Sequence, residues 1–405
     1  MKKIVIIGGG ASGLMAAIAA KNEDTQVVIL EREKRVGKKI LATGNGRCNM
    51  TNMYAALENY HGTEPGFVKG AIKRFWVTQT LDFFSELGIL WKEEKNGKVY
   101  PYSDTASSVL DVLRRKAENE RIEVICEFDV KEAIKTKSGF QITSYDGRKI
   151  FADSLIIAAG GKATPSLGSN GSGFDLLRAF GHKITKLSPS LVQMKTETEI
   201  VRKIKGLKIN GKMSLAEKTE SGEILFTEYG LSGPPVFSLS AYLNNQKYIC
   251  IDIMPEYSFD EIKAILYQRC AYLYDVKLEE FFTGMLNKRI GQALLKSVDI
   301  SPLSRLCSTL SEKEINNIAA AIKCWKFNLC GTMSWNNAQV TRGGVYTSEF
   351  NPSTMESRIV PQLYACGEVL DIDGDCGGYN LQWAWSSGYI AGNSSGKIRN
   401  KEFNK

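Results

Sequence analysis

A glycine-rich turn near the N-terminus, Gly8-Gly9-Gly10-Ala11-Ser12-Gly13, constrains the fold more than any other part of the sequence. It follows the β-branched run Ile4 to Ile7, which is typical of a strand buried on both faces of a parallel sheet, and it precedes a helical stretch. In the G-x-G-x-x-G spacing, Gly8 allows the tight turn, Gly10 lets the backbone approach a pyrophosphate, and Gly13 permits close helix–strand packing. The helix N-terminus adds free N–H groups and partial positive charge. The segment therefore predicts a dinucleotide phosphate site.

An acidic residue follows the second predicted strand, at a spacing from the glycine turn that is typical of nucleotide-binding domains. The strand runs from Gln26 to Leu30 and ends at Glu31, which lies 18 residues beyond Gly13. A carboxylate at this place accepts hydrogen bonds from ribose hydroxyls and disfavours a 2′-phosphate, so NADP is not expected here. Strand, glycines, helix, strand and acid in this order predict an α/β fold with a Rossmann-type nucleotide-binding domain. The alternative is a glycine-rich turn that binds nothing.

The C-terminal part returns to the same character. Residues 362–368 form a short apolar strand that runs into a glycine turn, and Gly377-Gly378 opens a helix that continues through Ala391. A second helix N-terminus near a flavin would stabilise negative charge on N1 and O2 of the reduced ring. Residues 155–161 form another buried strand that ends in small residues. These segments predict that both ends of the chain build one cofactor domain.

The intervening segments differ in pattern. Residues 34–52 are rich in Gly, Asn and cations; this loop either lies along a bound cofactor or is an ordinary surface loop. Helices are expected at 67–87, ended by Gly88, and at 105–119, begun by Ser103, Asp104 or Thr105. Short strands are expected between 122 and 158, with turns at Ser138-Gly139 and Asp146-Gly147.

The middle of the chain reads as an insertion. Residues 190–254 alternate like strands and carry turn signals at Asn210-Gly211 and Ser221-Gly222. Residues 258–323 look helical, with Ser258, Ser301 and Ser311 as helix caps. We therefore expect three parts: a Rossmann-type domain at 1–188 and 333–405, a β-rich insert at 189–257 and 324–332, and a helical insert at 258–323.

Composition excludes several classes of protein. The chain has 52 Lys and Arg against 44 Asp and Glu, a net charge of +8 that is scattered along the chain, so no nucleic-acid partner is expected. Nine cysteines without a C-x-x-C pair predict reduced thiols in a cytoplasmic protein and no zinc site. No apolar run approaches the ~18 residues of a membrane span. Asp371, Asp373 and Asp375 mimic the start of a calcium loop, but Cys376 and Gln382 occupy its glycine and glutamate positions, so no metal is expected.

Several motifs together resemble one bacterial flavoprotein family. They are the glycine turn, Thr43-Gly44-Asn45-Gly46-Arg47-Cys48-Asn49-Met50-Thr51-Asn52, Gly230-Leu231-Ser232-Gly233-Pro234, Gly343-Gly344-Val345, Thr354-Met355-Glu356-Ser357, and Gly367-Glu368-Val369-Leu370-Asp371 running through Gly388. The chain resembles the aminoacetone-oxidase-like and bile-acid-inducible-N-like FAD enzymes, NAD(P)/FAD-dependent oxidoreductases, over essentially its whole length.

The resemblance implies an FAD fold interrupted by a β-barrel and a helical part. It implies FAD contacts at Gly8, Gly10, Ala11, Ser12, Gly13, Glu31, Arg32, Lys39, Thr43, Gly44, Val130, Ala159, Gly160, Gly367, Glu368, Asn380, Leu381 and Gln382. Two positions depart from the family pattern. Thr227-Glu228 stands where many members have Thr-His, and Cys376 stands where Thr is common, so the substrate or its proton chemistry can differ.

Few residues are candidates for chemistry beyond the flavin itself. Arg47 is a candidate to hold an anionic substrate or the flavin, and Tyr379 to stack or donate at the ring. Cys48, beside Arg47, is a candidate for a thiol of lowered pKa, although packing is the alternative and no resolving cysteine is near. We expect structural roles for His61 and for His182, whose cation would be stabilised at a helix C-terminus.

The leading hypothesis is an FAD-dependent oxidoreductase that acts on a small or mid-sized organic substrate, with hydride transfer through flavin N5. It is either a reductase of an activated C=C or C=O bond that uses NAD(P)H, or an amine oxidase of the aminoacetone type that uses oxygen. The segment Gly168 to Gly173 lacks a preceding tight strand, so NAD(P)H would have to reach the flavin directly. The other hypotheses are an RNA-modifying flavoprotein and a non-catalytic flavin redox module. The sequence does not indicate an oligomeric state.

Overall fold

The computed structural model describes residues 1–243 and 246–397, and it divides into two compact units. The first unit consists of Met1–Pro189 and Gln339–Lys405, and the second of Ser190–Ala338. Each unit has its own hydrophobic core. The predicted α/β class with a parallel Rossmann-type sheet and an inserted β-barrel is confirmed.

The centre of the first unit is a five-stranded parallel sheet. Its strands, in spatial order, are β20 (Leu363–Ala365), β11 (Ser154–Ile157), β1 (Lys2–Ile7), β2 (Thr25–Leu30) and β7 (Glu123–Ile125). The four side chains of Ile4 to Ile7 are buried, as the sequence pattern predicts for a strand covered on both faces. Because β20 pairs with β11, the C-terminal segment completes the sheet that the N-terminus begins. The predicted assembly from both ends is confirmed.

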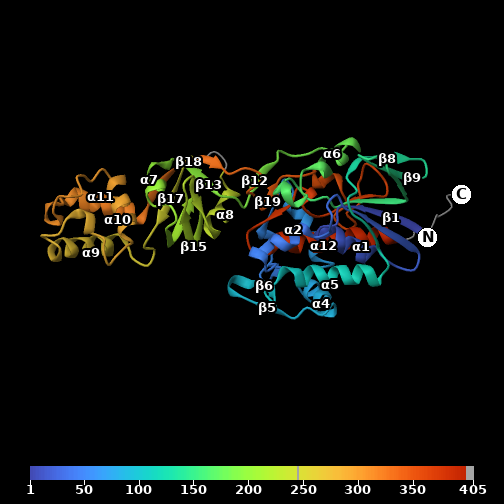
Figure 1. Cartoon of the computed structure of the whole chain (residues 1–405), viewed down its shortest axis with the longest axis horizontal. Coiled ribbons are helices and arrows are strands. Elements are labelled where there is room, and N and C mark those ends of the chain that lie inside the picture. The colour runs from blue at the N-terminus through green and yellow to red at the C-terminus, as the bar shows by residue number, and fades with distance from the viewer. Residues whose placement is uncertain (244–245, 398–405) are drawn as a thin grey trace. The chain divides into compact units, whose positions relative to one another are not determined.

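Two helices from opposite ends of the chain pack tightly together in this unit. Helix α1 (Ala11–Ala20) follows β1, and α12 (Tyr379–Gly396) contains Gly388, Gly392 and Gly396 at four-residue spacing (Figure 1). A Cβ atom on Gly388 would lie 2.4 Å from the carbonyl oxygen of Ser12, and one on Gly392 would lie 2.1 Å from that of Ala16. Residues four apart share one face of a helix, so these glycines form a seam that lets the backbones touch.

Smaller elements surround the sheet. The short sheets are β8 (Val130–Thr136), β9 (Gly139–Ser144) and β10 (Lys149–Ala152); β3 (Thr51–Asn52), β6 (Lys98–Pro101) and β5 (Trp91–Glu93); β4 (Tyr60–His61) with β21 (Asp373–Gly374); and β12 (Ser188–Ser190) with β19 (Val340–Arg342). The further helices are α2 (Lys38–Ala42), α3 (Lys69–Ile72), α4 (Val77–Glu86), α5 (Ala106–Asn119) and α6 (Ser172–Ala179). The hairpin turns predicted at Ser138-Gly139 and Asp146-Gly147 are confirmed.

The predicted helix boundaries in this region are largely confirmed. Gly88, with φ +96°, ends the helix at 77–86, and its N–H group donates to the carbonyl of Ser85. The region 67–87 holds two α-helices, because residues 73–76 interrupt the pattern. Thr105 is the residue before α5, although its side chain does not cap that helix.

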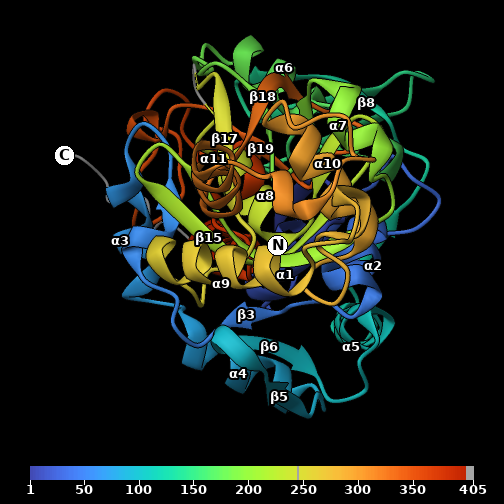
Figure 2. The same ribbon diagram turned by 90° about the vertical axis from the view of Figure 1, so that its left-hand side faces the viewer.

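The second unit contains a closed barrel of six strands. In spatial order they are β13 (Met194–Thr196), β16 (Gly230–Ser232), β15 (Lys218–Phe226), β14 (Lys208–Leu215), β17 (Tyr248–Asp252) and β18 (Trp325–Thr332). The accompanying helices are α7 (Thr198–Lys203), α8 (Pro234–Ser240), α9 (Phe259–Tyr272), α10 (Lys288–Ser297) and α11 (Glu312–Lys323). Helices α9, α10 and α11 lie together at one end of the barrel (Figure 1), and α9 is seen along its length in Figure 2.

Details of this unit correct the sequence analysis. Ser258 and Ser311 cap α9 and α11 as predicted, each in a reciprocal capping box. Ser301 caps no helix, because the segment after it forms a bridge between Leu306 and Lys277. The turn signals at 210–211 and 221–222 lie inside β14 and β15, which pair along their whole length.

A disulfide joins two neighbouring strands of the barrel. Cys250 in β17 forms a disulfide with Cys324, the residue before β18. The pairing of β17 with β18 brings the two cysteines together, so the expectation that all nine thiols are reduced is wrong for this pair. No helix in the described residues is long and apolar enough to cross a membrane.

The glycine seam makes a testable prediction about stability. Gly392→Ala should lower the free energy of unfolding by about 1–3 kcal/mol, because the new methyl group meets the backbone of Ala16, although Ala is normally the better helix former. Chemical denaturation of the purified protein measures the effect. Gly66→Ala is the matched control, because a Cβ there meets no atom within 4 Å. Equal stability of both variants would contradict the inferred contact.

Candidate functional site

The three motif glycines of the N-terminal turn have different surroundings. A Cβ on Gly8 would lie 2.4 Å from the carbonyl oxygen of Ala158, and one on Gly13 would lie 1.9 Å from that of Gly8. These two glycines therefore serve the packing of the turn against the helix and the neighbouring strand. A Cβ on Gly10 would meet nothing within 4 Å. Gly10 is also the N-cap of α1 and no side chain caps that end, so the N-terminus of α1 has open space beside Gly10.

Glu31 lies at the end of β2 beside this turn. Its side chain is buried and accepts hydrogen bonds from the N–H groups of Gly9 and Glu33, both at 2.8 Å. Burial raises the pKa of Glu31, and the two backbone hydrogen bonds oppose that rise. The geometry places an acceptor next to the helix N-terminus, as the sequence analysis expected for a ribose.

Arg32 extends the site along the edge of the sheet. Its Nη2 atom donates to Asp129 at 2.9 Å, whereas its Nη1 atom is buried and has no hydrogen-bond partner among the residues that the structure describes. Val130, the first residue of β8, follows Asp129 and is buried. An unsatisfied buried guanidinium nitrogen is what a protein shows where a ligand acceptor completes the site.

The turns after β11 and β20 also border the site. Gly367 approaches the glycine turn so closely that a Cβ on it would lie 2.5 Å from Oγ of Ser12. Glu368 accepts a hydrogen bond from Nζ of Lys39 at 2.9 Å. Ala159 and Gly160 follow β11, and Gly160 has φ +70°. Residues predicted from four separate segments therefore lie around one place.

The loop at 43–52 packs against the N-terminus of α12. Nδ2 of Asn52 donates to the carbonyl of Gly377 at 2.9 Å, and a Cβ on Gly378 would lie 3.0 Å from Oδ1 of Asn49. That oxygen of Asn49 is buried and has no hydrogen-bond partner within residues 1–243 and 246–397. Within the loop, Thr43 accepts from the N–H of Cys48 through its carbonyl at 3.0 Å. Gly44 has φ +56°, a left-handed conformation that glycine adopts readily.

The first turn of α12 contains the remaining predicted contacts. Asn380 bonds both ways with Gly374, each at 2.8 Å. Leu381 is partly buried. The side-chain amide of Gln382 is wholly engaged, because its nitrogen donates to Thr80 and Ser386 and its oxygen accepts from Thr51. Gln382 therefore holds the helix in place, and no polar atom of its side chain is left for a ligand.

These residues fit FAD. The two helix N-termini lack side-chain caps, and Gly10 leaves room for a phosphate. Two buried polar atoms, on Arg32 and Asn49, have no hydrogen-bond partner in the described part of the chain. The end of α1 would hold the pyrophosphate, Glu31 the ribose, and the N-terminus of α12 together with the 43–52 loop the ring.

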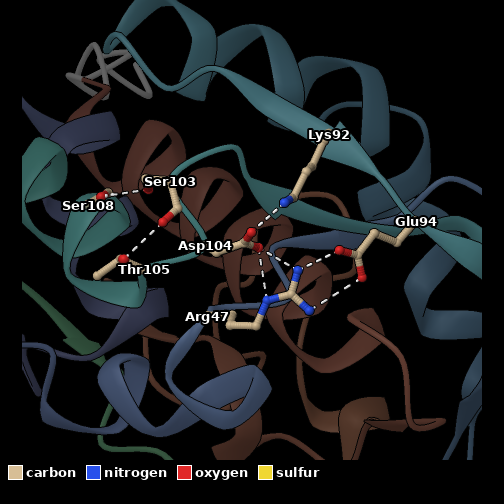
Figure 3. Close-up of polar contacts among 7 residues, drawn as sticks. All are labelled: Arg47, Lys92, Glu94, Ser103, Asp104, Thr105 and Ser108. Atoms are coloured by element: carbon tan, nitrogen blue, oxygen red, sulfur yellow. Dashed lines mark hydrogen bonds and ion pairs between the residues drawn. The ribbon is translucent and has the colours of Figure 1, made fainter.

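Arg47 is neutralised by its neighbours (Figure 3). Its Nε donates to Asp104 at 2.9 Å, its Nη1 to Glu94 at 3.3 Å, and its guanidinium lies 4.0 Å from the centre of the Tyr100 ring. Lys92 also pairs with Asp104. A hydrogen bond from Arg47 lowers the pKa of Glu94, hydrogen bonds from Lys92 and Arg47 lower that of Asp104, and the two carboxylates raise the pKa of Arg47. The sequence analysis treated Asp104 only as a possible helix cap and missed this cluster, because its members lie far apart in the chain.

The other two candidates for chemistry are Cys48 and Tyr379. Cys48 is buried, and burial raises the pKa of its thiol to about 12, so the expected lowered pKa is wrong. Tyr379 opens α12, and its ring meets Tyr60 edge to face with centroids 6.3 Å apart.

The two histidines are held by hydrogen bonds. Nε2 of His61 lies 2.7 Å from Oδ1 of Asp375. His182 is bonded to Glu349 and Ser357, and burial lowers its pKa, so the expected stabilised cation is wrong.

Glu228, at the position that departs from the family pattern, is exposed in the second unit. Its carboxylate pairs with Nζ of Lys205 at 2.8 Å, and this bond lowers its pKa. It therefore remains a charged carboxylate at neutral pH.

The comparison with known families decides the assignment. The sequence profile described as HI0933-like protein Rossmann domain matches residues 2–394. The chain belongs to this family. The predicted membership is thereby confirmed, and with it the prediction of an FAD-dependent oxidoreductase.

Curated relatives cover almost the whole chain. The chain is 39% identical to the 3-dehydro-bile acid delta(4,6)-reductase of Clostridium scindens over 98% of its length and 99% of the relative. It is 30% identical to the ribosomal RNA dihydrouridine synthase of Escherichia coli, over 95% and 96% of the two chains. Among solved structures, a 3-ketosteroid-Δ4-(5α)-dehydrogenase from Rhodococcus jostii is similar with a TM-score of 0.49 and 13% identity, over 98% of this chain and 97% of the other. That likeness carries no argument about a substrate.

The open space at Gly10 predicts a selective loss of cofactor. Gly10→Val should raise the Kd for FAD about tenfold or more, because the side chain fills the place of a phosphate, while the fold is kept. The ratio of flavin to protein absorbance, together with circular dichroism, measures this. Gly66→Val is the control and should retain FAD. A Gly10 variant that keeps its FAD would contradict the assignment.

The burial of Cys48 predicts that it is unreactive. With a pKa of about 12, on the order of one thiol in 10⁴ to 10⁵ is ionised near neutral pH, so iodoacetamide should not label Cys48 in the folded protein. The exposed Cys330 should be labelled in the same sample and serves as the internal control. Peptide mapping by mass spectrometry compares the two. Rapid labelling of Cys48 would restore it as a candidate for chemistry.

Proposed function

We propose that the chain reduces a carbon–carbon double bond conjugated with a carbonyl group in a small or mid-sized substrate, with FAD as the hydride donor and NAD(P)H as the source of electrons. The observation that carries the proposal is the 39% identity, over almost the whole of both chains, to a protein named as a bile-acid Δ(4,6)-reductase. The amine oxidase and the non-catalytic redox module have no comparable support.

Two relatives are named for reactions of the same class, the reduction of a carbon–carbon double bond. A 3-dehydro bile acid with a Δ4 double bond is an enone, and the double bond of uridine that becomes saturated in dihydrouridine lies next to a carbonyl. Hydride addition to such a bond occurs at the carbon remote from the carbonyl, and a proton is added at the neighbouring carbon. An enone reductase therefore needs a hydride donor, a proton donor and a hydrogen bond to the carbonyl oxygen.

The polar contacts of the site support an uncharged reacting group. The guanidinium of Arg47 is paired with Glu94 and Asp104, so it is not a free anchor for an anionic substrate. We therefore assign Arg47 to holding the 43–52 loop in place. Cys48 is assigned to packing, and Tyr379 to the edge of the ring, where it begins α12.

Electrons would arrive without a second nucleotide domain. The segment at 168–173 leads from β11 into α6, and a Cβ on Gly173 would lie 3.0 Å from Cβ of Ala159. This glycine therefore serves the packing of α6 against its strand. We propose that the nicotinamide nucleotide reaches the flavin face directly. When bound, FAD supplies the hydride through N5.

A second candidate is the reduction of uridine in RNA. It rests on the 30% identity to a ribosomal RNA dihydrouridine synthase over 95% of the chain. A net charge of +8 is compatible with an RNA substrate, although the sequence shows no dense basic run. We rank it second because the identity to the bile-acid reductase is higher.

An anaerobic flavin assay tests the proposal. NADH or NADPH should bleach the bound flavin, and addition of a 3-oxo-Δ4 steroid or bile acid should restore its colour and yield a product with two more hydrogens. RNA transcripts and aminoacetone with oxygen are the comparison substrates. Restoration of colour by RNA alone would favour the second candidate. Oxidation of an amine by oxygen, with no enone turnover, would overturn the proposal.

A further inference from the structure

Asp373 is a buried carboxylate that the protein leaves without hydrogen bonds. It lies in β21 and is 1% exposed, and neither of its side-chain oxygens has a hydrogen-bond partner among the described residues. A buried ionised carboxylate without donors is strongly destabilising, so such a group either holds a proton or meets a ligand. The sequence pattern did not reveal it, since Asp371, Asp373 and Asp375 looked like the start of a calcium loop.

The position of Asp373 connects it to the cofactor site. The next residue, Gly374, is bonded in both directions to Asn380 in the first turn of α12. On another side, β19 ends at Arg342, and the N–H group of Thr341 in this strand donates to Glu368 at 2.7 Å. Asp373 is therefore next to a residue bonded to the first turn of α12, which we assign to FAD, and near a strand that is hydrogen-bonded to Glu368.

Four charged or titratable groups face Asp373. His61 is its direct cross-strand partner in β4, and Arg342 comes from β19. Asp371 and Asp375 lie on either side of it along the chain, and their carboxylates are engaged by Thr63 and by His61. Burial raises the pKa of Asp373 to about 6, against the lowering effects of Arg342 and His61. In the described part of the chain, no group of three or more His, Cys, Asp or Glu side chains is arranged to hold a metal ion.

We propose that Asp373 is the proton donor of the double-bond reduction, placed at the ring end of the FAD site to protonate the carbon next to the substrate carbonyl. This inference rests on the proposed function. In the step, the O–H bond of Asp373 breaks and a C–H bond forms at that carbon, while the hydride from reduced FAD adds to the other carbon. The substrate gains two electrons and the flavin loses them. The carboxylate then takes a proton from solvent, and NAD(P)H supplies the next electron pair.

Anaerobic stopped-flow measurements on the FAD-loaded protein separate this role from a structural one. In Asp373→Asn, bleaching of the flavin by NAD(P)H should stay within about twofold of the wild type, whereas recolouring by the enone should slow about 10²- to 10⁴-fold, the usual contribution of a general acid. Asp82→Asn, which changes an exposed carboxylate on α4, should leave both half-reactions unchanged. Equal slowing of both half-reactions, or loss of FAD from Asp373→Asn, would assign the carboxylate to the cofactor or the fold and overturn the proposal.

The pH dependence of the wild type provides a measurement that needs no variant. A proton donor must be protonated, so the recolouring rate should be constant below a pH of about 6 and fall roughly tenfold per pH unit above it. A rate that stays constant across this range would contradict the proposal.

Infrared spectroscopy gives a readout that does not depend on turnover. The difference spectrum between about pH 5 and about pH 8 should contain the carbonyl band of protonated carboxyl groups, and the intensity of one carboxyl group should be missing from that band in Asp373→Asn but not in Asp82→Asn. If the wild type reduces no enone, the proposed function fails, and this band still decides whether Asp373 holds a proton. If the wild type is active and Asp373→Asn recolours at the wild-type rate, the proposal of enone reduction is kept and the proposal that Asp373 is the proton donor is wrong.

Discussion

The contact between α1 and α12 is the constraint on which the cofactor site depends. Gly388, Gly392 and Gly396, four residues apart, let the backbone of α12 touch that of α1, and the contact brings two helix N-termini into one unit. Each N-terminus carries partial positive charge and unpaired N–H groups. A dinucleotide with a pyrophosphate at one end and an electron-accepting ring at the other matches that arrangement. A side chain in the seam would separate the helices and thereby the two halves of the site.

The charged residues around the site have different roles, some in binding and some in chemistry. Arg47 and Lys92 neutralise Glu94 and Asp104 at the edge of the 43–52 loop, so that cluster shapes the loop without offering a net charge to a substrate. Glu31 is held by backbone donors that favour its acceptor role. Asp373 has no such donors, and burial therefore dominates its protonation. Carboxylates of the same kind thus acquire different roles from their surroundings alone.

The sequence predicted the parts of the site that local pattern controls. The glycine turn, Glu31 and the helix after Gly378 each follow from spacing and from the order of strand and helix. The sequence could not predict contacts between distant segments, such as those of Arg47 with partners 47 and 57 residues away. It also could not predict the burial of Cys48, which raises the pKa of the thiol where the sequence analysis expected a lowered one. Gly211 looked like a turn residue, but it lies in β14, where a Cβ would meet the backbone of Asp252 at 2.7 Å. A close strand neighbour and a tight turn both select glycine, and sequence alone does not separate them.

The discontinuity of the first unit has a consequence for how the protein is made on the ribosome. Helix α1 is synthesised early, but its partner α12 and the edge strand β20 come only after the whole insert. The second unit is one continuous stretch of chain, with its own core and a disulfide within it. Because contiguous units fold as they emerge, we expect the barrel and its helices to be complete while the nucleotide-binding half still waits for its last segment. During that interval the small-residue face of α1 is uncovered, and the nascent chain is most open to chaperones.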